Sequence, residues 1–197
     1  MKRVAVIVLL SIAAVAGDDK DKVRFSPGPA SSYAGHQTMD KITLAAVPFL
    51  NEDQVRTAFG KVNPYKYGVL PVLVILENAS VKALRLELQA EFVQPDGRHL
   101  DATPASDVVY VGANPGRRTV PTPGPLPLPR KQKKGPLNTW EIEGRGFSAR
   151  MVPAGESVHG FFYFQTEYRP GARLYITGVK DAASGKDFFY FEVPIEK

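Results

Sequence analysis

The stretch VLPVLVILE at residues 69–77 is the part of the sequence that decides the fold class. It is an almost continuous apolar run of the length of one strand, and such runs are typical of strands that are buried on both faces. Pro71 lies near its beginning, where a missing amide donor is tolerated. The sequence therefore predicts a central strand here, covered on both sides by other parts of the chain.

The next segment has a different pattern, because apolar residues alternate with charged or amide residues from Leu84 to Phe92. Strict alternation is typical of an antiparallel strand with one face in water. Between turns rich in Gly, Pro, Asn and Asp, the same reasoning predicts further strands. They are expected at residues 41–49, 107–111, 147–151, 158–166, 173–179 and 187–195.

One short helix is predicted between the strand at 41–49 and the strand at 69–77. Asn51 can cap it, Gln54 stands at the capping-box position, and Val55, Ala58 and Phe59 recur at helical spacing. Gly60 then ends it. Many short strands with one helix favour an all-β fold, an immunoglobulin-like antiparallel β-sandwich, with a small barrel as the alternative.

The N-terminus has the pattern of a signal peptide. Lys2 and Arg3 precede an apolar stretch that ends in small residues, which predicts a signal peptide at residues 1–16. The apolar run is shorter than the roughly 20 residues of a spanning helix, so no transmembrane segment is expected after cleavage. Residues 17–37 are polar and rich in Ser, Gly and Pro, which indicates a flexible leader. A single domain is expected at 38–197.

The composition narrows the classes of function. The chain has no cysteine, which excludes disulfides, thiolate metal sites and a cysteine nucleophile. An exported protein without cysteine suits a bacterial envelope, so we expect a periplasmic or secreted protein. The formal net charge of +5 falls to +3 once Lys2 and Arg3 are removed, so the basicity must be judged by where it lies. Nucleic acid is not an expected partner, because the chain is predicted to be exported and has no recognisable nucleic-acid-binding fold.

The remaining basicity is concentrated in a Pro-rich basic loop at residues 112–136. This segment holds seven prolines and no carboxylate. Its length exceeds that of ordinary loops, and its prolines favour an extended arm. We interpret it first as a solvated insertion between strands; the alternative is an arm that contacts an envelope protein, a glycan or another anionic surface. The candidate binding residues are Arg117, Arg118, Arg130, Lys131, Lys133 and Lys134.

No constellation of catalytic, cofactor-binding or metal-binding residues is predicted. The histidines His36, His99 and His159 are not spaced to converge on a metal. The segment Gly155–Gly160 resembles a nucleophile elbow only in part, because its second glycine is one residue too far from Ser157. The aromatic residues near the C-terminus are expected to fill the core, with a stacking platform as the alternative.

Several segments resemble a group of small exported bacterial proteins that carry no assigned activity. The segments are AFGKVNPYKYGVLPV at 58–72, PAGES at 153–157, GFFYF at 160–164 and FFYFE at 188–192. The resemblance implies a β-sandwich fold and an envelope location, and it implies no site residues.

Three functional hypotheses remain open from the sequence. The first is a non-enzymatic interaction or binding module of the bacterial cell envelope. The second is an enzyme or metal-binding protein whose site is assembled from dispersed residues such as His99, Asp101, Glu156 and His159. The third is a structural envelope component that self-associates through exposed strand edges.

Overall fold

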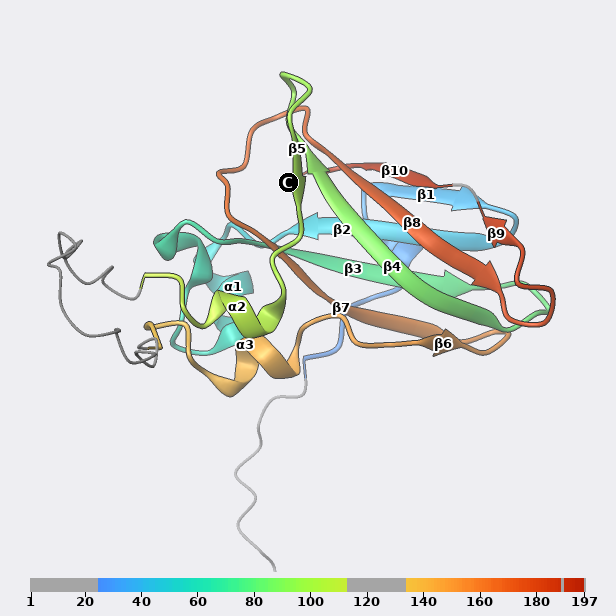
Figure 1. Cartoon of the computed structure of the whole chain (residues 1–197), viewed down its shortest axis with the longest axis horizontal. Coiled ribbons are helices and arrows are strands. Elements are labelled where there is room, and N and C mark those ends of the chain that lie inside the picture. Colours follow the sequence, from blue (N-terminus) through green and yellow to red (C-terminus); the bar gives the residue numbers. More distant parts are fainter. Residues whose placement is uncertain (1–24, 113–133, 189, 197) are drawn as a thin grey trace, which may run out of the picture.

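Two antiparallel sheets form the body of the molecule (Figure 1). The structure is a computed structural model that describes residues 25–112, 134–188 and 190–196. The first sheet has the order β1-β2-β3-β7, with β1 at His36–Met39, β2 at Ile42–Pro48, β3 at Leu70–Asn78 and β7 at Ser157–Phe164. The second has the order β10-β8-β4-β5, with β10 at Phe191–Pro194, β8 at Arg173–Asp181, β4 at Leu84–Val93 and β5 at His99–Asp101. Two short strands complete it, β6 (Met151–Val152) beside β4 and β9 (Asp187–Phe188) beside β8.

The main core lies between these sheets, which confirms the predicted all-β sandwich. Alternate residues of β3, from Leu70 to Leu76, face alternate residues of β4 and β8. The two strongest strand predictions are confirmed: β3 is buried along almost its whole length, and the first four residues of β4 alternate strictly between buried and exposed. The two strands differ because the outer face of the second sheet lies in water, whereas that of the first sheet is covered.

Helices cover the outer face of the first sheet and create a second apolar core. They are α1 (Glu52–Phe59), α2 (Ala105–Val108) and α3 (Trp140–Gly144), drawn together beside β7 in Figure 1. Leu73 and Ile75 of β3 pack there against Phe59 and Ile142. This covering layer is the physical reason that residues 69–77 are apolar at consecutive positions.

Two predictions about this layer are wrong. The described residues contain three α-helices rather than one, and residues 107–111, predicted as a strand, begin inside α2. The amide of Val108 donates to the carbonyl of Pro104 at 3.1 Å, and Val108 is fully buried in the second core. A short apolar run does not by itself distinguish a buried strand from a buried helical turn.

Part of the predicted flexible leader packs against the domain instead. Ala30 is fully buried in a 3-10 turn (Ala30–Ser32), and its amide donates to Glu77 Oε1 at 2.8 Å. Residues 36–37 already belong to β1. Burial of Ala30 and strand pairing offset the entropy that the polar composition suggested would keep this segment unfolded. The predicted signal peptide at 1–16 and the leader residues 17–24 lie outside the described residues.

The later strands are predicted with mixed success. Strands β7 and β8 are confirmed, whereas the strand expected at 147–151 is reduced to β6 and the one expected at 187–195 is divided into β9 and β10. Residues 145–147 instead run along the edge of β7, where the amide of Phe147 donates to the carbonyl of Phe161 at 3.0 Å. Among the described residues, no helix has the length and hydropathy needed to cross a membrane.

Candidate functional site

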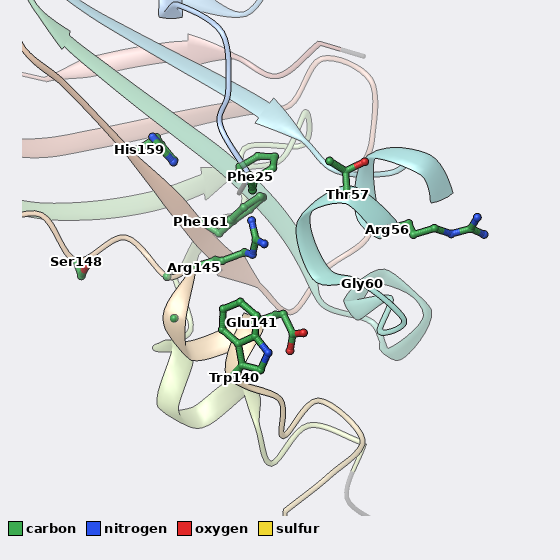
Figure 2. Close-up of a pocket in the computed structure, with 12 residues that line it drawn as sticks. Phe25, Arg56, Thr57, Gly60, Trp140, Glu141, Arg145, Ser148, His159 and Phe161 are labelled. Carbon is green, nitrogen blue, oxygen red and sulfur yellow. The ribbon is translucent and has the colours of Figure 1, made fainter. Parts of the chain in front are cut away.

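A cavity of about 580 Å³ opens on the helix-covered side of the first sheet, between α1, α3 and β7 (Figure 2). We call it the outer-face cavity. It is lined by Phe25, Arg56, Thr57, Gly60, Trp140, Glu141, Gly144, Arg145, Gly146, Ser148, His159 and Phe161. Its walls combine three aromatic rings with two arginines, one histidine and one carboxylate.

Gly160 determines how the walls come together. A Cβ atom at this position would stand 2.5 Å from the Cα of Phe147, so only glycine lets residues 145–147 lie flat against β7. The amide of Phe161 donates to the carbonyl of Arg145 at 2.8 Å. The backbone thus fixes Arg145 beside Phe161 and His159, which flank Gly160 on β7.

Arg145 is the central charged group of the cavity. Its guanidinium carbon lies 5.1 Å from the centroid of the Phe25 ring and 5.8 Å from that of the Trp140 ring, both in the range of cation–π contacts. Nε is shielded from water and has no hydrogen-bond partner. No ion pair within the described part of the chain includes Arg145. Burial lowers the pKa of this guanidinium, and the negative charge of Glu141 opposes that effect.

The aromatic floor of the cavity belongs to the second core. The Phe161 ring lies 5.6 Å from Phe25, 4.9 Å from Phe49 and 4.7 Å from Phe59, measured between centroids. Behind it, the hydroxyl of Tyr163 donates to the carbonyl of Ile142 at 2.8 Å, and this hydrogen bond connects β7 to α3. Burial raises the pKa of the Tyr163 hydroxyl. The C-terminal aromatic residues are therefore divided, because Phe164 points instead into the main core against Phe92.

His159 forms the far wall of the cavity. Burial, and secondarily the positive charge of Arg145, lowers the pKa of His159 from its ordinary value of 6.5. Since the folded state disfavours the protonated ring, the resulting stability is fully present above pH 6.5 and is lost as the pH falls below that value.

This shift predicts a measurable pH dependence of stability. His159→Gln is expected to reduce the difference in Tm between pH 7.5 and pH 5.5, because glutamine cannot take up the proton that the unfolded wild-type chain binds. Thermal denaturation followed by circular dichroism at a series of pH values measures this. An unchanged dependence in the variant would contradict the role assigned to burial of His159.

The structure does not bring the sequence-predicted basic residues to this cavity. Lys134 is exposed and does not line it. The other candidates of the basic loop lie outside the described residues: Arg117, Arg118, Arg130, Lys131 and Lys133. The proposed role of that loop stays a prediction.

The residues of the dispersed enzyme or metal site are also not gathered. Nδ1 of His99 lies 2.7 Å from Glu91 Oε2 at the edge of the second sheet, and Asp101 is on the same strand. His159 is in the first sheet, and Glu156 precedes it in a turn. The described residues hold no group of three or more His, Asp or Glu side chains arranged for a metal ion.

Sequence reasoning missed the residues that build the cavity, above all Phe25, Trp140 and Arg145. In the sequence, the tryptophan of the chain stands shortly before an arginine that is flanked by glycines, but this pattern does not indicate that the two side chains share a cavity.

The fold and the cavity together define a β-sandwich with one helix-covered sheet. No protein-family model matches the sequence, and no curated protein is significantly similar to it.

Proposed function

We propose that this chain is a non-enzymatic binding module exported to the bacterial cell envelope, and that the outer-face cavity is its ligand site. The proposed partner is an envelope component that carries an anionic group. The signal-peptide pattern at residues 1–16 and the absence of cysteine support the location. The arrangement of Arg145 supports the choice of site.

We also propose that the sandwich is immunoglobulin-like. Strands β2, β3 and β7 have the order of strands A, B and E, and strands β10, β8 and β4 have the order of G, F and C. In this scheme β5 takes the place of the additional strand beside C. Such sandwiches serve widely as scaffolds for binding, although the fold alone does not define a ligand.

One observation carries the binding proposal. A partly buried arginine lies between two aromatic rings in the wall of a cavity of about 580 Å³, with its Nε unpartnered. Burying a cation is costly, and Glu141 offsets this cost without forming an ion pair with Arg145 among the described residues, so an anionic ligand that binds the guanidinium directly would offset more of it. A cavity of this size, lined by both aromatic and polar side chains, falls within the size range of small-ligand sites.

The test is to fill the cavity and ask whether binding is lost. Thr57 lines the cavity from the exposed side of α1, so Thr57→Phe is expected to occupy it without disturbing the core. Saturation-transfer NMR with a set of neutral, cationic and anionic aromatic fragments is expected to give signals with the wild type that Thr57→Phe reduces at least about fivefold.

The matched control is Gln54→Phe, which adds the same ring to an exposed position of the same helix outside the cavity. It is expected to retain the wild-type signals. Equal signals from wild type and Thr57→Phe, or equal loss in both variants, would contradict the assignment of the site.

A further inference from the structure

We propose that the outer-face cavity is specific for organic monocarboxylates, with the carboxylate at Arg145 and a flat apolar body against the exposed surface of Trp140. This inference rests on the function proposed above and adds the chemical class of the ligand. Three properties of the cavity lead to it: the geometry of the cation, the charge balance of the walls and the aromatic surface.

The cation favours a planar anion. Arginine presents its donors in a flat fork that matches the two oxygens of a carboxylate. The rings of Phe25 and Trp140 hold this fork in place, so little side-chain entropy is lost when a ligand binds. In Figure 2 the guanidinium of Arg145 points into the space next to Phe25 and Phe161.

The charge balance favours a single negative charge. Glu141 lines the same cavity and is close enough to raise the pKa of Arg145, so it repels a second negative charge on a ligand. His159 contributes a ring whose neutral form is favoured by burial. Arg56 reaches the rim from α1, but its side chain extends away from Arg145 in Figure 2. One cation therefore faces the interior, and a dianion such as a phosphate monoester is disfavoured.

The walls favour an apolar body with a flat face. Trp140 is a large aromatic residue that stays 56 % exposed beside the cavity, and the partly exposed ring of Phe25 adds to the apolar lining. Burial of an apolar ring of a ligand against such surfaces stabilises the complex in proportion to the apolar area that is removed from water. A bare carboxylate such as acetate lacks this contribution, so it is expected to bind much more weakly than an aromatic carboxylate.

The single tryptophan provides a site-specific probe. Trp140 is the one tryptophan of the chain, so its indole N–H gives one cross-peak in a ¹⁵N-correlated NMR spectrum. The probes are 4-methylbenzoate, its neutral analogue 4-methylbenzyl alcohol, the dianion 4-methylphenyl phosphate and acetate, each titrated at pH 7.5. We expect 4-methylbenzoate to shift this peak and to bind at least about tenfold more tightly than each of the other three.

Variants then test the role of Arg145. Arg145→Gln is expected to weaken binding of 4-methylbenzoate at least about tenfold and to leave that of the alcohol unchanged. Arg145→Lys keeps the charge but lacks the planar guanidinium, so its affinity for 4-methylbenzoate is expected to lie between those of the wild type and Arg145→Gln. If Arg145→Gln does not fold, the lysine variant alone tests the inference. The matched control is Arg150→Gln, an exposed arginine outside the cavity, which is expected to bind like the wild type.

The outcomes separate this inference from the function on which it rests. Equal or tighter binding of the alcohol or the phosphate would overturn the ligand class, while the cavity would remain the binding site. Loss of binding in Arg150→Gln equal to that in Arg145→Gln would overturn the role of Arg145. No shift with any probe, together with fragment signals that Thr57→Phe does not change, would overturn both proposals.

Discussion

Gly178→Ala is expected to lower the free energy of unfolding by about 3 to 5 kcal/mol. Gly178 lies in β8 opposite an irregularity in β4, where the register shifts between Leu86 and Gln89. Its φ is +85°, and an added Cβ would overlap the carbonyl oxygen of Glu87. The variant must therefore distort the backbone of two central strands as well as adopt a left-handed conformation. Urea denaturation is expected to show a strong decrease in the midpoint concentration.

Gly185→Ala is the matched control for this prediction. Gly185 also has a positive φ, +71°, but no atom lies within 4 Å of a Cβ built there. Only the conformational cost remains, which is about 1 kcal/mol. A loss of similar size in both variants would show that close contact between β4 and β8 does not limit the residue at position 178.

Asn78→Asp is expected to cost about 2 to 4 kcal/mol of stability at neutral pH. The side chain of Asn78 is 1 % exposed at the end of β3. Its Nδ2 donates to three carbonyl oxygens, those of Lys82, Val152 and Pro153, at 2.7, 3.2 and 3.0 Å. An aspartate would direct a carboxylate oxygen at these acceptors. The destabilisation is expected to diminish at lower pH, because a protonated carboxyl can again donate to one of them.

Asn63→Asp provides the comparison. Among the hydrogen bonds of the described residues, the side chain of Asn63 uses only its Oδ1, which accepts from the amide of Tyr65 at 3.0 Å. Aspartate serves this capping role equally well, so a change within about 0.5 kcal/mol is expected. Chemical denaturation of both variants at pH 7 compares them, and equal stability of Asn78→Asp and wild type would refute the role of the three carbonyl contacts.

The fold could be predicted from the sequence where periodicity is strong. Residues 69–77 and 84–92 show which faces are covered, because burial on one or two faces leaves a direct pattern in strand sequence. Residues 107–111 could not be assigned, since a few consecutive apolar residues suit either a strand or a helical turn. Ala30 shows a further limit, because a small residue in a polar segment gives no sign that it will be buried.

The cavity could not be predicted, for a different reason. Its residues come from segments that are distant in the sequence, and none of Phe25, Trp140 or Arg145 is unusual by itself. Only the close approach that Gly160 allows along the edge of β7 places Arg145 between the two rings. Sequence reasoning emphasised the basic loop because uncompensated charge is visible in composition, whereas the partners of a single arginine are visible only in three dimensions.

The position of Phe25 also has a consequence for the order in which the molecule is built. Phe25 is synthesised early, whereas its contacts Arg145 and Phe161 come from the last third of the chain. That wall of the cavity is therefore completed only when the segment from Arg145 to Phe161 is in place, and a polypeptide that begins after Phe25 lacks one wall of the site.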